Sequence, residues 1–350
     1  MIRSFLFAVI LWCVTFALYV YPYNVMTYLL FDTKLVEDIS LWIAAILAVV
    51  MYYYFRTHAS GIFLSAIAHY GLGFGFIGFM VFHLGWLASS FLPSWRYEIG
   101  LVSVGCFICV SLYSLYLGRK LTIKPLLIEH AKLTAETKAI FISDIHLGSN
   151  SRTHLQAIIN QIAPLDYDML MIGGDLFDSS SFQSDDLTPL RQLDKPIYFI
   201  TGNHEYYVKD HDKKLSSLES YGITTLHNEA VMCHDINLIG ISDNQSVKDQ
   251  AALADALCES QSFNLILVHQ PALWQIAPAD TDFMISGHTH QGQIFPFQWL
   301  VRLQFKTVYG LFKRGESSLY VSSGAATWGP PMRLGTQNEI IYLTFRGAGN

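Results

Sequence analysis

The sequence predicts an α-helical membrane bundle followed by an α/β domain, and three observations support this. Of the 350 residues, 52% are hydrophobic and only 14% are charged, which is too apolar for one water-soluble domain of ordinary composition. Long uncharged stretches fill the first third of the chain, whereas short apolar runs alternate with segments of helical spacing in the rest. We therefore expect a membrane domain at 1–118, a linker at 119–136 and an α/β domain at 137–350.

The distribution of charge excludes several classes of protein. Residues 1–118 hold four basic and four acidic side chains, so the net charge of −6 belongs entirely to the remainder. This acidic balance provides no broad basic surface, and we expect no long nucleic acid as a partner. The five cysteines show neither zinc nor disulfide spacing, which favours a reducing compartment.

Four stretches are long and apolar enough to cross a bilayer as helices, which takes about 20 residues each. They lie near 4–22, 39–55, 62–86 and 99–117. A cleavable signal peptide is the alternative for the first stretch, but no small-residue cleavage pattern follows it. A hairpin or re-entrant piece around Gly71–Gly75 is the alternative for the third, and a fifth crossing would reverse the following domain.

The basic residues that flank these stretches predict the orientation, because such residues accumulate on the cytoplasmic side. With four crossings, five of them share one side and only Lys34 and Arg96 face the other. We expect an integral membrane protein with a cytoplasmic N-terminus and a cytoplasmic C-terminal domain, in the inner or plasma membrane if the chain is bacterial. The five are Arg3, Arg56, Arg119, Lys120 and Lys124.

The third stretch contains two histidines, His69 and His83, whose spacing allows them to share a helix face. Ionisable groups inside a membrane are often functional, but neutral histidines hydrogen-bonded between helices explain the pattern equally well. Gly71 and Gly75 form a pair of small residues that permits close approach of another helix.

After Thr137 the pattern is that of a layered α/β domain. Segments of helical spacing occur at His154–Ile162, Lys213–Tyr221 and Lys248–Cys258. The predicted strands are Ala139–Ser143, Met169–Gly173, Ile197–Thr201, Leu238–Ser242, Leu265–His269, Phe283–Ser286, Leu319–Ser322 and Ile340–Phe345.

Polar residues follow five of these strands directly. Because ligands of open α/β sheets gather beyond the carboxyl ends of the strands, we expect the five blocks to meet in one crevice. The blocks are Asp144-Ile145-His146, Gly174-Asp175-Leu176-Phe177-Asp178, Gly202-Asn203-His204-Glu205, His269-Gln270-Pro271 and Gly287-His288-Thr289-His290.

These residue types suit a pair of divalent metal ions, which needs imidazole and carboxylate ligands from several loops and one carboxylate shared between the ions. In an extended segment, residues i and i+2 point to the same side, so Asp144 with His146, and His288 with His290, can each offer two ligands. Glycines before Asp175, Asn203 and His288 permit sharp turns and close approach of the backbone.

The ordered blocks resemble the D-x-H, G-D-x-x-D, G-N-H-E, H and G-H-x-H motifs of the calcineurin-like metallophosphoesterases. The resemblance covers roughly residues 136–346 and implies a layered αββα sandwich. His290-Gln291-Gly292-Gln293 and Trp328-Gly329-Pro330-Pro331-Met332-Arg333 are similar to the membrane-anchored bacterial subgroup and to animal transmembrane proteins that carry this domain.

By matching position, the resemblance implies a complete set of metal ligands. Asp144, His146 and His290 would hold the first ion, Asp175 would bridge, and Asn203, His269 and His288 would hold the second. The family uses manganese, iron or zinc, and we expect manganese first. The implied reaction is in-line attack on phosphorus by a metal-bound hydroxide.

Three further residues receive roles by position. The resemblance makes His204 a catalytic residue that stabilises the transition state or protonates the leaving oxygen. Asp178 suits a carboxylate that orients a ligating histidine, and the alternative is a carboxylate at a helix N-terminus. Arg333 is a candidate for binding a substrate phosphate, and the alternative is an ordinary surface arginine.

The membrane domain narrows the expected substrate, because a phosphoesterase does not itself require four spans. Ile294–Arg314 interleaves aromatic and basic residues, which suits the headgroup boundary of a bilayer, although a buried strand or hairpin is an equal alternative. We expect a lipid-linked phosphodiester or pyrophosphate such as UDP-2,3-diacylglucosamine. The alternatives are cyclic or linear nucleotides, with the spans as a tether, and a non-catalytic membrane receptor or scaffold.

Overall fold

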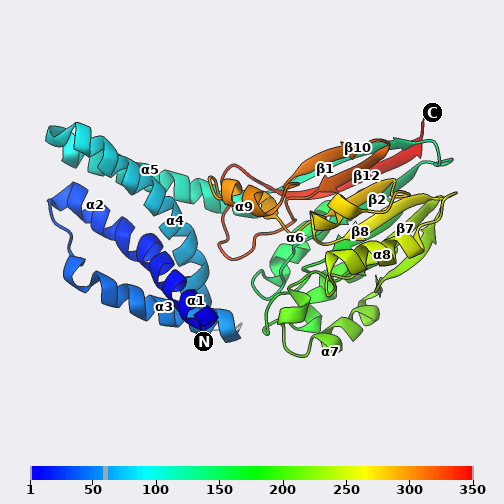
Figure 1. Cartoon of the computed structure of the whole chain (residues 1–350), viewed down its shortest axis with the longest axis horizontal. Helices are drawn as coiled ribbons and strands as arrows, with labels where there is room; N and C mark the ends of the chain where they lie inside the picture. The colour runs from blue at the N-terminus through cyan, green and yellow to red at the C-terminus, as the bar shows by residue number, and fades with distance from the viewer. Residues whose placement is uncertain (1, 58–61, 349–350) are drawn as a thin grey trace. The chain divides into compact units, whose positions relative to one another are not determined.

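The computed structural model describes residues 2–57 and 62–348 and divides the chain into two compact units (Figure 1). The membrane unit comprises Met1–Tyr116 with Gly329–Met332, and the sheet unit comprises Leu117–Trp328 with Arg333–Asn350.

Within the residues that the structure describes, four helical segments are long and apolar enough to span a bilayer, as predicted: Phe5–Phe31, Glu37–Arg56, Leu64–Phe91 and Pro93–Arg119. The helices are α1 (Ile2–Thr15), α2 (Tyr21–Phe31), α3 (Ser40–Thr57), α4 (Ile62–Phe91) and α5 (Arg96–Arg119). Helix α4 continues without a break through Gly71 and Gly75, which argues against a re-entrant piece at that point.

The first span is longer than predicted, because it does not end at Pro22. A π-helical turn at Phe16–Val20 precedes α2, and Pro22 lies in the first turn of that helix. A proline is tolerated in the first turn, where its missing N–H has no helical partner to lose. The π-helical turn accommodates the wider backbone spacing before Pro22, and the helical segment continues to Phe31.

The two membrane histidines each have a hydrogen-bond partner on another helix. The hydroxyl of Tyr54 in α3 lies 2.6 Å from Nε2 of His69, and the hydroxyl of Tyr21 in α2 lies within hydrogen-bond distance of Nδ1 of His83. These pairs match the packing alternative, in which neutral histidines link helices.

Gly75 allows close packing within the membrane unit, because a Cβ atom there would overlap the backbone carbonyl oxygen of Leu18. We expect Gly75→Ala to lower the unfolding free energy by about 1–3 kcal/mol, as overpacking does. The measurement is the thermal midpoint of the detergent-purified full chain. Gly105→Ala in α5 is the matched control, since its Cβ would meet no atom within 4 Å; equal midpoints for the two variants would contradict the prediction.

The sheet unit contains two six-stranded sheets. In spatial order, the first sheet consists of β1 (Leu121–His130), β12 (Asn338–Gly347), β2 (Thr137–Ile142), β3 (Met169–Gly173), β4 (Ile197–Ile200) and β5 (Ile223–Thr225). The second consists of β10 (Gly310–Arg314), β11 (Ser317–Val321), β9 (Phe283–Ser286), β8 (Phe263–Val268), β7 (Ile236–Ile241) and β6 (Glu229–Cys233).

The region 119–136 is not simply a linker, because it contains β1, which pairs in parallel with β12 from Leu121 to His130. This strand lies at the edge of its sheet. An edge strand tolerates Pro125 and polar residues on its open side, and these features hide the alternation by which strands are recognised.

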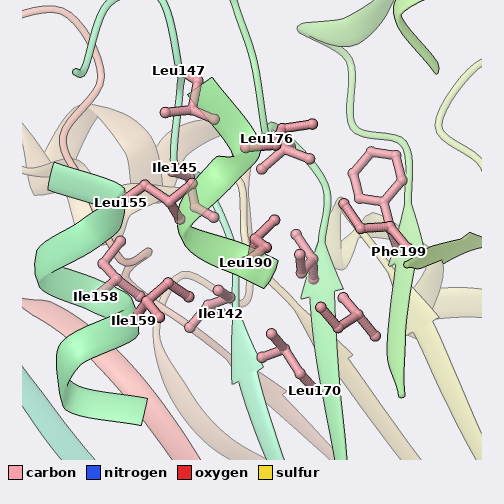
Figure 2. Packing of buried hydrophobic residues seen from close by; sticks show 14 of the residues in the cluster. Ile142, Ile145, Leu147, Leu155, Ile158, Ile159, Leu170, Leu176, Leu190 and Phe199 are labelled. Carbon is pink, nitrogen blue, oxygen red and sulfur yellow. The ribbon is translucent and has the colours of Figure 1, made fainter. Parts of the chain in front are cut away.

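The layers are those of an αββα sandwich, with an apolar core between the sheets and one on each outer face. Helix α6 (Arg152–Ile162) buries residues at helical spacing against the first sheet, and Figure 2 shows Leu155, Ile158 and Ile159 pointing toward Ile142 and Leu170. Helix α8 (Val247–Leu257) packs on the second sheet, beside β7 (Figure 1).

The parallel strands bring the polar blocks to the same end of the sandwich. Strands β2, β3 and β4 are mutually parallel neighbours in the first sheet, and β8 and β9 are parallel neighbours in the second. Each of the five polar blocks begins at or just after the carboxyl end of one of these strands.

Candidate metal centre

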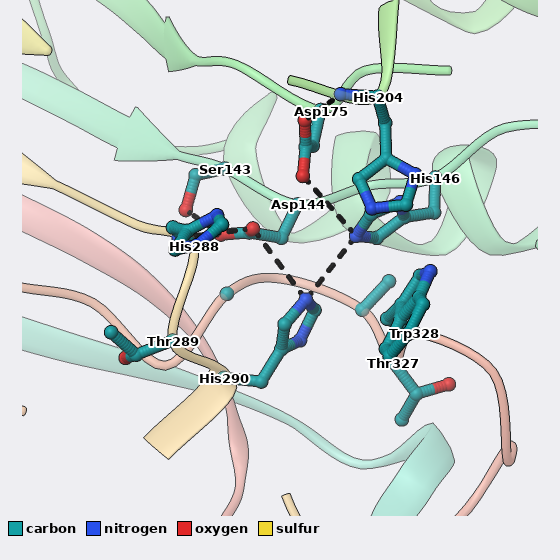
Figure 3. Close-up of polar contacts among 12 residues, drawn as sticks. Ser143, Asp144, His146, Asp175, His204, His288, Thr289, His290, Thr327 and Trp328 are labelled. Carbon is teal, nitrogen blue, oxygen red and sulfur yellow. Dashed lines mark hydrogen bonds and ion pairs between the residues drawn. The ribbon is translucent and has the colours of Figure 1, made fainter. Parts of the chain in front are cut away.

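Two groups of buried or half-buried side chains converge where these strands end (Figure 3). The first group is Asp144, His146 and His290, and the second is Asp175, His269 and His288. Within each group, one potential ligand atom from every residue lies within 4.8 Å of the others. These are six of the seven residues expected to bind metal.

Asp175 lies between the two groups. Its Oδ2 atom is 3.1 Å from Nε2 of His269 in the second group and 3.8 Å from Nε2 of His146 in the first. Nε2 of His146 is in turn 3.2 Å from Nε2 of His290, and Nε2 of His269 is 3.2 Å from Nδ1 of His288. Asp175 therefore lies where one carboxylate could serve both groups of donors.

The side chains present fit divalent metal ions. Burial lowers the pKa of His288 to about 4 and that of His290 to about 3, so both imidazoles are neutral at neutral pH and can donate a lone pair. Oδ1 of Asn203, the seventh expected ligand, is buried and has no hydrogen-bond partner in the part of the chain that the structure describes. A buried acceptor without a partner is costly unless a ligand satisfies it.

The backbone at the expected ligands adopts a conformation that non-glycine residues rarely use. Asp144, His146, Asp175, His288 and His290 all have positive φ, between 47° and 72°. Such strain persists only where the surrounding structure enforces it, and it is concentrated at functional sites. The five residues thus share a costly backbone geometry that aims their side chains at one place.

Two glycines at the site permit close approach, as expected. A Cβ at Gly202 would overlap the carboxylate of Asp175, and a Cβ at Gly287 would overlap that of Asp144. Larger residues at either position would displace an expected ligand.

Asp178 lies beside the first group in the place expected of an orienting carboxylate. Its Oδ2 atom is 3.3 Å from Nδ1 of His146, the ring nitrogen opposite the one that faces His290. The backbone N–H of Ser149 donates to its other oxygen at 3.0 Å. His146, Asp178 and His204 also form a third set of atoms within 4.8 Å. Asp178 faces Nδ1 of His146, the ring nitrogen that points away from His290. We therefore interpret this third set as a carboxylate that orients the ring of His146, and not as a separate metal site.

Glu205 is a fully buried site residue to which the sequence assigned no role. Its carboxylate accepts backbone N–H groups from Asp175 at 3.1 Å, Gly202 at 2.7 Å and Phe177 at 3.0 Å. Burial and the nearby charge of Asp175 raise the pKa of Glu205 to about 7. Glu205 therefore fixes the loop of Asp175 against the loop of Asn203.

His204 lies at the open side of the centre. Its ring is 4.9 Å from the ring of His146, and its backbone N–H donates to Oδ1 of Asp175 at 3.0 Å. The half-exposed rings of Trp328 and Tyr207 lie 5.6 and 5.3 Å from it. Burial lowers the pKa of His204, because it disfavours the charged form of the ring.

Comparisons with known proteins show which family the domain resembles. The family model for calcineurin-like phosphoesterases matches residues 137–292. An uncharacterized metallophosphoesterase of Aquifex aeolicus is 30% identical over 245 residues, which cover 66% of this chain and 94% of the relative. The chain belongs to the calcineurin-like phosphoesterase family. The residues that match the family model lie in the sheet unit.

Two further relatives are longer. An uncharacterized metallophosphoesterase of Helicobacter pylori is 37% identical over 228 residues, 61% of this chain and 60% of the relative. A bovine protein named "Transmembrane protein with metallophosphoesterase domain" is 35% identical over 236 residues, 60% of this chain and 53% of the relative. The matched part thus spans just over half of each of these relatives.

Arg333 does not occupy the position of a phosphate-binding residue. It is fully buried, and its guanidinium donates to the backbone carbonyl oxygens of Ser323, of Ala326 at 2.8 Å and of His290 at 3.1 Å, and to Oδ1 of Asn338. Its donors are committed within the protein, and one of them holds the loop of His290, an expected metal ligand. The sequence could not reveal the contact with His290, which lies 43 residues away in the chain.

Replacing Arg333 with lysine should therefore destabilise the domain. Lysine cannot reproduce the fork of donors, and each buried carbonyl left unpaired costs about 1–3 kcal/mol, so we expect a loss of roughly 3 kcal/mol or more. The thermal midpoint of the full chain measures this. Arg152→Lys, on the exposed start of α6, is the control. An unchanged midpoint for Arg333→Lys together with a raised KM would contradict a positioning role and restore phosphate binding.

Proposed function

We propose that this chain is a membrane-anchored phosphoesterase with two divalent metal ions, which hydrolyses a phosphodiester or pyrophosphate bond in a lipid-linked substrate. The observation that carries the proposal is the placement of Asp175 between two converging sets of donors, in a domain that follows four candidate spans.

The proposed chemistry assigns each residue a task. Asp144, His146 and His290 would hold one ion, Asn203, His269 and His288 the other, and Asp175 both. When bound, such ions lower the pKa of a bound water and neutralise charge on the phosphoryl oxygens. His204, beside the ring of His146, would donate a proton to the leaving oxygen, a contribution of about 10²- to 10⁴-fold in rate.

Three features support a lipid-linked substrate. The domain begins directly after the last candidate span, which confines it to the membrane surface. The acidic balance of the chain disfavours long polyanions but not small phosphate esters. Trp328 and Tyr207 beside His204 provide aromatic surface for a base or an acyl chain. UDP-2,3-diacylglucosamine is a small phosphate ester that carries both a base and acyl chains, so it is the first substrate to test.

The catalytic domain is proposed to face the cytoplasm, on the basis of the basic residues that flank the spans. A cysteine at the exposed Met232 in β6 tests this, in a chain without its native cysteines. A membrane-impermeant maleimide should label Met232→Cys only after the cells are permeabilised. Equal labelling in intact cells would place the domain outside.

The substrate is tested with the detergent-purified full chain and Mn²⁺. Hydrolysis of UDP-2,3-diacylglucosamine is compared with that of bis-p-nitrophenyl phosphate and of a cyclic nucleotide. Faster turnover of the lipid supports the proposal. Cleavage of the cyclic nucleotide without the lipid would make the enzyme a nucleotide phosphodiesterase whose spans are a tether. Cleavage of none of the three, by a protein that retains its metal, would favour a receptor or scaffold.

A further inference from the structure

The segment Phe295–Phe305, which contains helix α9 (Gln298–Gln304), exposes a concentration of large apolar side chains. Leu303 is 83% exposed and Trp299 is 60% exposed, and Leu300, Phe295 and Phe297 are also exposed. Trp299, Leu300 and Leu303 lie on one side of α9 by helical spacing. The ring of Phe295 packs 5.3 Å from that of Trp299. A contiguous apolar surface of this kind marks an interaction site.

The charged residues within and beside this segment in the sequence are all basic. Arg302 and Lys306 are exposed, and the sequence from Gly287 to Arg314 contains no aspartate or glutamate. Aromatic and aliphatic residues beside lysine and arginine suit the boundary between acyl chains and anionic headgroups.

The sheet unit also holds this segment close to the point where the chain leaves the last candidate span. The side chain of Gln298 donates to the carbonyl oxygen of Gly335 at 3.3 Å. Asn338, three residues further on, donates to the carbonyl oxygen of Gly118 in the last turn of α5 at 2.8 Å. Three residues span at most about 11 Å. The start of α9 is therefore tied to the end of a membrane span.

The same segment is attached to the metal centre. His290 precedes Phe295 by five residues, a reach of at most about 18 Å. The intervening loop is fixed by Thr336, whose hydroxyl donates to the carbonyl oxygen of Gln293 at 2.6 Å, and by a backbone bond from Phe295 to Leu334. A surface that enters the bilayer here would hold the centre over lipid headgroups.

We propose that Phe295–Phe305 inserts its apolar side chains into the headgroup region of the bilayer that the spans cross, and that it presents lipid phosphates to the metal centre. The bilayer is the occupant because the segment is basic, apolar and tied to the end of α5. The presentation of lipid phosphates rests on the proposed function, whereas the insertion itself does not.

Insertion is tested on the full chain in liposomes of phosphatidylcholine and phosphatidylglycerol. The five native cysteines are replaced by alanine, and an environment-sensitive fluorophore is attached to Leu303→Cys. Lipids with a spin label near the headgroup should quench it several-fold more than the same fluorophore on Met232→Cys, an exposed residue of β6. Equal quenching at the two positions would overturn the proposal. Blue-shifted emission without lipid quenching would also overturn it and indicate a protein partner, such as a second copy.

Presentation of lipid is tested with Trp299→Ser/Leu303→Ser. In liposomes, KM for UDP-2,3-diacylglucosamine should rise at least about tenfold, while kcat/KM for bis-p-nitrophenyl phosphate stays unchanged. An unchanged KM for the lipid would overturn this part of the proposal. If the unmodified chain hydrolyses neither substrate, both the proposed function and the presentation of lipid phosphates fail. The quenching experiment still decides whether Phe295–Phe305 inserts into the bilayer.

Discussion

His204→Ala is expected to lower kcat for bis-p-nitrophenyl phosphate by about 10²- to 10⁴-fold, the range of general acid catalysis. His204 stands beside the ring of His146 without being one of the expected ligands. KM and the metal content should change little, because no expected ligand is removed. Steady-state kinetics and elemental analysis of the same preparation measure these quantities.

A matched histidine outside the centre provides the control for this variant. His211 at the start of α7 (His211–Ser216) is half-buried and pairs with Asp212 at 3.4 Å. His211→Ala should retain full activity. If His204→Ala keeps its kcat, the leaving group needs no proton from this residue. If His204→Ala loses metal instead, the residue belongs among the ligands.

Asp175→Asn is expected to have the largest effect on metal binding. The amide retains the oxygen that accepts the N–H of His204, but it removes the charge between the two groups. Loss of an outer-shell partner costs a metal site about 10- to 100-fold in affinity or activity, so loss of this shared carboxylate should cost more than about 100-fold. Metal per chain and the hydrolysis rate are both measured.

Asp212→Asn, at a side chain that is 95% exposed, controls for the change of charge and should match the unmodified chain. A bound-metal content and a rate that both remain unchanged in Asp175→Asn would contradict the bridging position.

The sequence predicted most of the central architecture because the central strands carry a strong local signal. All eight predicted strands are present, since each is an apolar run and most residues in each are buried. The edge strand β1 and the outer strands β5, β6 and β10 were missed, because a short or half-exposed strand mixes polar and apolar residues. The first span was placed too short because Pro22 marks a helix end in most contexts.

The residues of the candidate site could be predicted where short local sequence motifs identify them. The expected ligands follow strand ends directly, so short motifs are sufficient to find them. Arg333 was assigned a different role, because its contact with His290 forms only in the folded chain. Glu205 was missed for the same reason, because its partner Phe177 is distant in the sequence. The positive φ angles at the expected ligands could not be predicted from residue type either, because aspartate and histidine adopt them more often than most residues but still only at a minority of positions.

The most direct test of the metal centre is the rate at which the chelator-stripped full chain hydrolyses bis-p-nitrophenyl phosphate as Mn²⁺ is added back. We predict no hydrolysis above background without metal, and a rate that rises until about two ions are bound per chain. A rate that is insensitive to stripping, or that is complete with one ion bound, would contradict a centre in which Asp175 is shared by two ions.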